Sequence, residues 1–468
     1  MSLIFNLEKI VGSNQVLANP ENTKFNSDWT GEFNFRPKAV VRPRNVGQIS
    51  KILELANNRK IPIVPSGGNT GLSGGTYADN AIILSLELMN DIREIRAVSK
   101  IAIVESGVIL SDLRNAVNHQ DLSFPLNFGA KSSAMIGGIL STNAGGSNVI
   151  KYGNARDLCL GIEAVLPNGD IMNLMSELHK DNSGYNLKQL LIGAEGTLGI
   201  ITAAVLKLHP KQKKHATALA AVESIDAAIS LLNRLQAVTG GAVEAFEYMP
   251  DTYLIKYLSL FPEARAPFSQ NYKFNILIEL ASSIESFTNQ KPNSKVSLTD
   301  CLENVLQDCF SKEMVLDAVI SQNERQRQDM WKMREAAAEV IISKKPLLNN
   351  DIAVPLDKIG SFLEVVSRRL AELDNGAESV CVAHLGDGNI HYTIWPQSLD
   401  TAVHYKTMEM VEEVVISLGG SFSAEHGIGK SKLGSMERLK NPVALKVMKT
   451  IKSSLDPNNI LNPFKVIP

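Results

Sequence analysis

The stretch Pro65-Ser66-Gly67-Gly68-Asn69-Thr70-Gly71-Leu72-Ser73-Gly74-Gly75 follows a short apolar run, residues 61–64, that predicts a buried strand. Five of the nine residues from Gly67 to Gly75 are glycine. Glycine tolerates positive φ and lets backbone approach a ligand, so this loop can turn several N–H groups toward one anion. It matches neither G-x-G-x-x-G nor a P-loop. The stretch predicts a pyrophosphate-binding loop, with an ordinary flexible glycine loop as the alternative.

Two further segments rich in small residues follow. The first runs from Gly129 to Gly138 and continues as Ser141-Thr142-Asn143-Ala144-Gly145-Gly146. The second is Gly193-Ala194-Glu195-Gly196-Thr197-Leu198-Gly199-Ile200-Ile201. Small side chains let backbone lie against a flat ring system. A tightly packed helix–loop junction would explain one such segment, but their recurrence favours a cofactor.

Two histidines flank a turn near the C-terminal third of the chain. In His384-Leu385-Gly386-Asp387-Gly388-Asn389-Ile390-His391, we expect a hairpin with a two-residue type I′ turn at Asp387-Gly388. That register places His384 directly opposite His391, with the two Cβ atoms about 5 Å apart on one face. Such a pair could share a metal ion, although a structural pair is the more common case.

A third ligand type follows in Ser423-Ala424-Glu425-His426-Gly427. With His384 and His391, the Glu425 carboxylate completes a set of two histidines and one glutamate. That set suits zinc or another divalent ion with open coordination positions. The sequence therefore predicts a divalent metal site.

The length and composition of the chain argue against several classes of protein. The 468 residues suffice for two or three domains, and the net charge of -2 argues against a basic nucleic-acid-binding surface. No apolar run approaches membrane-spanning length, and the N-terminus has no signal-like pattern. The four cysteines are scattered without a C-x-x-C motif, which argues against a disulfide framework or thiolate metal site. We expect a cytoplasmic location.

Strands and helices without glycine loops follow residue 210. Residues 217–222, 243–248 and 274–280 predict strands, and residues 225–235 and 322–343 predict helices, the latter as one long helix. This alternation predicts a second, α+β domain.

The three glycine-bearing segments, W-x-x-R-E at Trp331 to Glu335, H-L-G-D-G-N-I-H, S-A-E-H-G and the terminal D-P-x-x-I-L-N-P together resemble one family. It is the vanillyl-alcohol-oxidase-type flavoproteins, in the branch of FAD-linked D-lactate and D-2-hydroxyglutarate dehydrogenases. The resemblance covers nearly the whole chain. It implies an α+β fold with a PCMH-type FAD-binding domain over residues 1–210. A ferredoxin-like α+β cap domain with the metal hairpin would cover 211–420, and a C-terminal helical segment 421–468.

The resemblance also assigns roles. His384, His391 and Glu425 would hold the metal, His426 would be the general base, and Arg334 would bind the substrate carboxylate. The residues implied to contact FAD are Pro65, Ser66, Gly67, Gly68, Asn69, Thr70, Gly71, Leu72, Gly74, Gly75, Pro125, Gly129, Ala130, Gly137, Gly138, Ser141, Thr142, Asn143, Ala144, Gly145, Gly146, Glu195, Gly196, Gly199, Ile200, Ile201 and Asn462. Some relatives attach flavin to a histidine in the first loop. Asn69 stands near that place, so we expect FAD to be non-covalent.

The chain departs from the D-2-hydroxyglutarate branch at three places. Where that branch has a threonine, a lysine and an asparagine, a gapless comparison puts Ala338, Asn349 and Thr393. A second substrate carboxylate would need donors to compensate its burial. These positions therefore favour a D-lactate-like or other monocarboxylate substrate.

The expected activity is FAD-dependent, zinc-assisted oxidation of a D-2-hydroxyacid to a 2-oxoacid, with hydride transfer to flavin. D-2-hydroxyglutarate or D-malate is the alternative substrate. Two rival functions are a same-fold transferase resembling alkylglycerone-phosphate synthase and a flavin-binding protein without catalysis. The expected partner is a small hydroxyacid, without nucleic acid or a transmembrane segment. The electron acceptor, a quinone or an electron-transfer flavoprotein, and a homodimeric state are left open.

Overall fold

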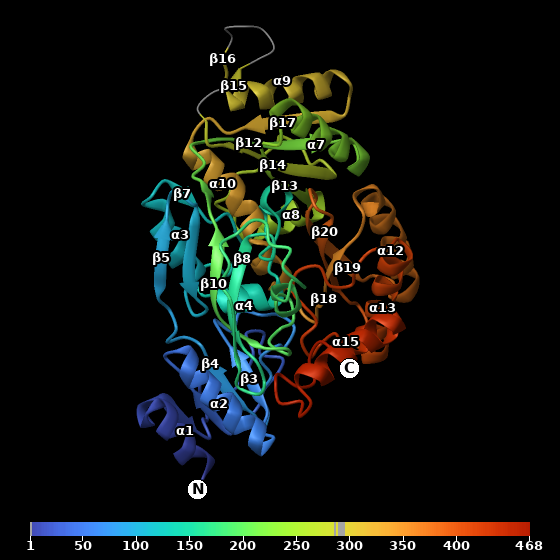
Figure 1. Cartoon of the computed structure of the whole chain (residues 1–468). Helices are drawn as coiled ribbons and strands as arrows, with labels where there is room; N and C mark the ends of the chain where they lie inside the picture. The colour runs from blue at the N-terminus through green and yellow to red at the C-terminus, as the bar shows by residue number, and fades with distance from the viewer. Residues whose placement is uncertain (1, 285–286, 289–294) are drawn as a thin grey trace. The chain divides into compact units, whose positions relative to one another are not determined.

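The computed structural model describes residues 2–284, 287–288 and 295–468, which form two units (Figure 1). Unit 1 comprises Met1–Gly145, Gly153–Pro210 and Glu425–Pro468, and unit 2 comprises Gly146–Tyr152 and Lys211–Ala424. Both units combine helices with sheets, so the predicted α+β class is confirmed. No helix among the described residues is both long and apolar enough to cross a membrane.

The first glycine loop follows the last residue of a strand in a small sheet of unit 1, and three strands of this sheet are parallel. The strand order is β1 (Val16–Ala18), β2 (Ala39–Val41), β4 (Ile82–Ser85) and β3 (Ile63–Ser66), with β2, β4 and β3 parallel. Helices α1 (Leu3–Val11) and α2 (Val46–Arg59) share its core, and 3₁₀ helix η1 (Ser13–Gln15) follows α1. The Asn45 side chain caps α2 by accepting the Gln48 N–H, and Ile49, Ile52 and Leu53 face inward.

A second sheet of unit 1 is antiparallel. Its order is β5 (Ile92–Arg96), β6 (Ile101–Glu105), β10 (Ile200–Lys207), β8 (Cys159–Val165) and β9 (Ile171–Leu174). A short pair, β7 (Leu122–Ser123) and β11 (His209–Pro210), lies outside it. The remaining helices of unit 1 are α3 (Leu110–Asn118), α4 (Ile136–Thr142), α6 (Lys188–Leu191), α14 (Leu433–Leu439) and α15 (Pro442–Leu455).

Unit 2 is built on one seven-stranded antiparallel sheet. The order is β17 (Val315–Ile320), β12 (Lys214–Val222), β14 (Phe274–Ser282), β13 (Val243–Pro250), β19 (Glu378–His384), β20 (Asn389–Trp395) and β18 (Leu348–Ala353). A two-stranded pair, β15 (Phe287–Thr288) and β16 (Lys295–Val296), precedes α9. The sheet is wide enough to carry polar side chains from several strands on one face.

Helices cover both faces of this sheet (Figure 1). On one face, alternate strand residues such as Phe246 and Ile278 pack against α7 (Ile225–Thr239), α9 (Leu298–Ser311), α12 (Ile359–Leu373) and α13 (Thr401–Ser417). On the other face, Leu219, Leu277 and Val382 pack against α8 (Asp251–Leu260), α10 (Glu324–Glu335) and α11 (Ala337–Ile342). Unit 2 also contains α5 (Val149–Tyr152) and η2 (Leu356–Lys358).

The single long helix expected over residues 322–343 is wrong. Two helices, α10 and α11, meet at Ala336, whose ψ is 11°. The buried Tyr253 hydroxyl donates a hydrogen bond to the Met333 carbonyl, which a continuous helix would use four residues later. A partner from α8 therefore replaces the helical bond at the break.

Candidate functional site

The first glycine loop packs closely against the second glycine-bearing segment of unit 1. A Cβ on Gly68 would lie 1.9 Å from the carbonyl oxygen of Ser133, so only glycine fits there. By contrast, a Cβ on Gly71, Gly129 or Gly138 would meet no described atom within 4 Å. One glycine is thus explained by packing, while the other three border space that a cofactor can use.

Asn69 is held in the loop by its own side chain. Its φ is 52°, its Nδ2 donates to the Ser27 carbonyl at 3.1 Å, and its Oδ1 accepts from the Thr76 hydroxyl at 2.7 Å. Asparagine tolerates this left-handed conformation better than most residues. The residue near the expected attachment position therefore has a structural explanation.

The third glycine-bearing segment and the C-terminal segment close together within unit 1. The Glu195 carboxylate accepts the N–H groups of Ile428 and Gly429 at 2.7 and 2.9 Å. Asn462 donates from Nδ2 to the carbonyls of Glu195 and Gly75 at 2.7 and 3.1 Å. Burial raises the pKa of Glu195, although the two amides oppose that shift. Glu195 and Asn462 fix the turn that follows His426.

The backbone at His426 is fixed from the first glycine loop. The Ser73 hydroxyl donates to the His426 carbonyl at 3.0 Å, and the Ser73 carbonyl accepts the Lys430 N–H at 2.8 Å. Gly427 adopts a φ of 74°, where a Cβ would lie 2.6 Å from Glu195 Oε1. Only glycine allows this close turn directly after His426.

The metal hairpin of unit 2 has a different register from the one predicted. His384 pairs with Asn389, and His391 pairs with Val382, so the predicted pairing of the two histidines is wrong. Residues 385–388 form the loop between the paired His384 and Asn389, so it is longer than the two residues expected. Within it, the N–H groups of both Asp387 and Gly388 bond to the His384 carbonyl. A Cβ on Gly388 would also lie 2.3 Å from the Val354 carbonyl.

The two histidines nevertheless share a face of the sheet, because the register differs from the predicted one by two residues along the hairpin. Their ring centroids are 5.3 Å apart and their rings are nearly perpendicular. A diagonal pair on one face can supply two ligands to one ion, as an opposed pair can. The error in register therefore leaves the expected proximity intact.

A buried carboxylate on β13 joins two of the predicted site residues. Glu247 is 1% exposed, and its Oε1 lies 2.8 Å from His384 Nδ1. Its Oε2 accepts from Arg334 Nε at 2.7 Å. Burial alone would raise the pKa of Glu247, but His384 and Arg334 together lower it below its usual range. Glu247 is therefore an anion in contact with the predicted metal ligand and the predicted substrate arginine.

A second carboxylate accompanies the other histidine. Asp351 pairs with His391 across β18 and β20, and its Oδ1 lies 3.5 Å from His391 Nδ1. Asn389 Nδ2 donates to the same oxygen at 2.9 Å. The Asp351 carbonyl accepts the N–H of Ala424, the last residue of unit 2, and Glu425 follows directly in the chain.

Arg334 has donor capacity beyond its ion pair. The residue is 8% exposed, and its Nη2 is buried without a hydrogen-bond partner among the described residues. A buried, unpaired guanidinium nitrogen is costly, and a carboxylate is its natural acceptor. This orphaned donor fits the role that the sequence predicted for Arg334.

The three positions that set this chain apart from the D-2-hydroxyglutarate branch carry no cation. Thr393 donates from its hydroxyl to Asn349 Oδ1 at 2.9 Å, across β20 and β18. Ala338 lies in α11. A neutral pair therefore occupies two of the positions at which the gapless comparison expects donors for a second carboxylate.

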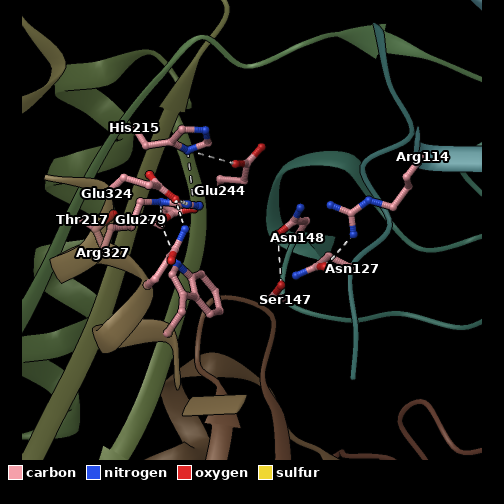
Figure 2. A network of polar contacts seen from close by, with 12 residues as sticks. Arg114, Asn127, Ser147, Asn148, His215, Thr217, Glu244, Glu279, Glu324 and Arg327 are labelled. Carbon is pink, nitrogen blue, oxygen red and sulfur yellow. Dashed lines mark hydrogen bonds and ion pairs between the residues drawn. The ribbon is translucent and has the colours of Figure 1, made fainter. Parts of the chain in front are cut away.

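A separate polar network lies on β12, β13 and β14 (Figure 2). His215, Glu244 and Glu279 bring three potential ligand atoms within 4.8 Å of one another. However, Glu279 already accepts hydrogen bonds from Arg327, from Thr217 and from Trp331 Nε1. Because Arg327 offsets its charge, this network is a poor cation site.

Sequence reasoning missed Glu247 and Asp351. Glu247 stands in the otherwise apolar run Phe246-Glu247-Tyr248-Met249, and a carboxylate in such a run is the signal that could have identified it. Asp351 similarly opens the apolar end of β18. Both carboxylates are buried and contact the Nδ1 side of a predicted metal ligand.

Two protein-family models together match most of the chain. Residues 37–175 match the model described as "FAD binding domain". Residues 211–466 match the model described as "FAD linked oxidases, C-terminal domain".

Similar curated proteins match over almost the full length. The chain is 34% identical to D-2-hydroxyglutarate dehydrogenase of Stutzerimonas stutzeri, covering 99% of the chain and 98% of the relative. It is 34% identical to mitochondrial D-2-hydroxyglutarate dehydrogenase of Arabidopsis thaliana, covering 98% and 80%. It is 31% identical to a D-2-hydroxyglutarate–pyruvate transhydrogenase of Saccharomyces cerevisiae, covering 98% and 92%.

Solved structures share the fold at low identity. A p-cresol methylhydroxylase with bound substrate superposes with a TM-score of 0.73 at 17% identity, covering 99% of this chain and 95% of the other. An alkyldihydroxyacetonephosphate synthase gives a TM-score of 0.67 at 16% identity, covering 92% and 77%. At these identities the similarity shows the fold alone.

Proposed function

The chain belongs to the FAD-linked oxidases, in the branch of the D-2-hydroxyacid dehydrogenases, and we propose that its substrate is D-2-hydroxyglutarate or a close analogue. The orphaned Nη2 of Arg334 carries the assignment of a hydroxyacid, because it calls for a substrate carboxylate inside unit 2. The names of the similar curated proteins support the dicarboxylate over the monocarboxylate that the sequence favoured.

A divalent metal, zinc in the first instance, would be held by His384, His391 and Glu425. Supporting this set, each histidine turns its Nδ1 toward a buried carboxylate, 2.8 Å away for His384 and 3.5 Å for His391. That arrangement makes Nε2 the ligating nitrogen and is the usual outer shell of a metal-bound histidine. When bound, the metal would supply Lewis-acid polarisation of the substrate oxygen.

The chain's own residues orient the substrate and move its proton. Arg334 binds a carboxylate through its Nη edge while Glu247 holds its Nε. His426 removes the proton of the C2 hydroxyl, since an imidazole is the side chain best suited to that task near neutral pH. FAD, when bound to the glycine-bearing segments, supplies the acceptor for the C2 hydride.

FAD is proposed to be bound without a covalent link. Asn69 uses its side chain in bonds to Ser27 and Thr76, and no histidine occurs from Pro65 to Gly75. Acid precipitation of the purified yellow protein should release the flavin into the supernatant. Flavin that remains with the precipitate would contradict this proposal.

A neutral-tailed D-2-hydroxyacid such as D-lactate is the second candidate. The Asn349–Thr393 pair and Ala338 favour it, because they bring no charge to the positions that differ from the D-2-hydroxyglutarate branch. The pocket would then have Arg334 as the cation for a single carboxylate.

The test is anaerobic bleaching of the flavin. D-2-hydroxyglutarate, D-malate, D-lactate, D-2-hydroxybutyrate and their L enantiomers are compared, followed by kcat/KM with one artificial acceptor. We expect reduction by D enantiomers, fastest with D-2-hydroxyglutarate. A tenfold advantage of D-lactate, which is about 1.4 kcal/mol, would instead support the second candidate. A flavin that no hydroxyacid reduces would contradict the proposed activity.

The role of His426 has its own test. His426→Ala should lower the rate of flavin reduction by roughly 10²–10⁴-fold, the usual cost of losing a positioned base. Bound FAD should remain near one equivalent. A loss below tenfold would assign the base elsewhere.

A further inference from the structure

We propose that Glu247 is a positioning residue that orients a metal-ligating histidine and the substrate-binding arginine at the same time. This inference rests on the proposed function, because His384 and Arg334 have those roles there. It adds a residue that neither the motifs nor the matched families identify.

The geometry makes Glu247 a bridge. One carboxylate oxygen lies 2.8 Å from His384 Nδ1 and the other lies 2.7 Å from Arg334 Nε. The three side chains come from β19, α10 and β13, so the contact joins three separate elements of unit 2. At 1% exposure, the carboxylate is shielded from water that would otherwise loosen these bonds.

The bridge sets the tautomer of His384. An ionised carboxylate can only accept hydrogen bonds, so His384 must carry its proton on Nδ1. Nε2 then has the lone pair that a metal ion requires. Without an acceptor at Nδ1, the competing tautomer would carry the proton on the ligating nitrogen.

The bridge also sets which edge of Arg334 meets the substrate. A guanidinium is a rigid plane, so fixing Nε through Glu247 fixes the direction of both Nη groups. Nη2 is the buried atom without a partner among the described residues. Glu247 therefore directs the orphaned donor while it holds the histidine.

Glu247→Gln separates these roles from simple packing. The amide has almost the same shape but one oxygen, so it cannot accept from His384 Nδ1 and Arg334 Nε with separate oxygens. If its NH₂ group faces His384, that imidazole must accept at Nδ1 and carry its proton on Nε2. Glu247→Gln should therefore lower the metal affinity, change the direction of the Arg334 guanidinium, or do both.

Glu279→Gln is the matched control. Glu279 is 3% exposed on the neighbouring strand β14, and Arg327 of the same helix α10 donates to it at 2.6 and 2.8 Å (Figure 2). Its carboxylate accepts hydrogen bonds from Thr217, Arg327 and Trp331, and none of these groups belongs to the bridge. The control thus removes a buried carboxylate of the same sheet and helix without touching His384 or Arg334.

The experiment measures zinc affinity of the FAD-bound protein directly. Wild type, Glu247→Gln, Glu247→Asp and Glu279→Gln are stripped with a chelator, and zinc is titrated against a chromophoric competitor. Loss of an outer-shell partner usually costs 10–100-fold in metal affinity, and we expect that loss for Glu247→Gln. Glu279→Gln should stay within about twofold of wild type, and Glu247→Asp should lie nearer to wild type than Glu247→Gln does.

Kinetics at saturating zinc then isolate the effect on Arg334. Glu247→Gln should raise KM for D-2-hydroxyglutarate at least about fivefold even when the metal site is filled, since the guanidinium has lost its fixed direction. The KM of Glu279→Gln should be unchanged.

Distinct results overturn the inference and the proposed function. Zinc affinity of Glu247→Gln within twofold of wild type overturns the inference, as does an equal loss in Glu279→Gln. A wild-type protein that binds no zinc overturns the proposed metal set and the inference with it.

Discussion

Two buried glutamates on the same face of the unit 2 sheet have nearly the same surroundings. Glu279 on β14 and Glu247 on β13 are both almost inaccessible, and each pairs with an arginine of α10. They differ in whether the arginine partner has an unpaired hydrogen-bond donor. Arg327 completes its contacts with Glu279 and Glu324, whereas Arg334 has a buried Nη2 without a partner among the described residues.

The comparison separates a structural ion pair from a functional one. Around Glu279, hydrogen bonds from Arg327, Trp331 and Thr217 satisfy the carboxylate itself. His215 Nδ1 lies beside it without a hydrogen-bond partner among the described residues (Figure 2). Around Glu247, the partners are His384, which we propose as a metal ligand, and Arg334, whose Nη2 has no partner among the described residues. Buried charge alone therefore does not identify a site, and what sets the Glu247 pair apart is that the arginine itself keeps an unpaired, buried guanidinium nitrogen.

Removing one histidine from each network should give the largest contrast. His384→Ala should lower turnover by about 10³-fold or more, because losing metal assistance costs several kcal/mol of transition-state stabilisation. FAD should stay bound. His215→Ala, in the Glu279 network, should leave turnover within about threefold. Zinc content by elemental analysis and steady-state rates check both, and full activity of metal-free protein would contradict the metal site.

The two arginines should show opposite phenotypes. Arg334→Gln should lower kcat/KM by about 10²-fold, since truncating a buried charged partner costs roughly 3 kcal/mol. Arg327→Gln should leave kcat/KM within about threefold but destabilise the fold by about 3 kcal/mol, because Glu279 loses its cation. Steady-state kinetics and urea unfolding of both variants measure kcat/KM and the free energy of unfolding. Equal effects on both quantities would erase the distinction between the networks.

The stability supplied by Glu279 should depend on pH. Burial opposes its ionisation, but the nearby His215 ring, hydrogen bonds from Arg327 and Trp331, and the charge of Arg327 lower its pKa from 4.5 to about 2. A lowered folded-state pKa stabilises the fold fully above pH 4.5, and that contribution disappears as the pH falls toward 2. The shift corresponds to about 3 kcal/mol.

The measurement compares wild type with Glu279→Gln. Their difference in urea midpoint should be largest at pH 6 and should shrink by pH 3.5. A difference that stays constant over this range would show that Glu279 is not the titrating group.

The smallest expected effect concerns substrate choice. Installing Asn349→Lys together with Ala338→Thr should raise the ratio of kcat/KM for D-2-hydroxyglutarate over D-lactate by about tenfold, or 1.4 kcal/mol. The lysine would add a cation where Asn349 now pairs with Thr393. Asn349→Met is the uncharged control of similar length. An unchanged ratio would place these positions outside the substrate pocket.

Local patterns predicted the elements whose causes are local. The helix expected over residues 225–235 forms as part of α7, because its apolar spacing and its Ser224 cap lie in the segment itself. The strand expected over residues 61–64 also forms, as β3, but it lies two residues later, over Ile63–Ser66. The proximity of His384 and His391 was also predictable, since both stand on strands joined by a short loop.

Features with distant causes could not be predicted this way. The break at Ala336 depends on Tyr253, which is 80 residues from Met333 in sequence. The hairpin loop is bonded to Val354, whose N–H donates to the Gly388 carbonyl at 3.1 Å. Glu247 meets His384 across 137 residues of sequence, so no local pattern links them.

The strand that leads into the glycine loop is bonded to the end of the chain. The Ile63 N–H donates to the Ile460 carbonyl at 2.7 Å, and the Asn462 N–H donates to the Ile63 carbonyl at 2.8 Å. During synthesis, β3 and its loop leave the ribosome early but must wait for these last residues. At about 5–20 residues per second, the intervening ~400 residues take roughly 20–80 s.

Throughout that interval the edge of β3 exposes backbone groups that the finished protein covers. Unit 1 therefore closes only after the whole of Lys211–Ala424 has been made, because its segments lie on both sides of that stretch. Nascent chains therefore carry an open strand edge from the synthesis of β3 until Ile460 and Asn462 have been made.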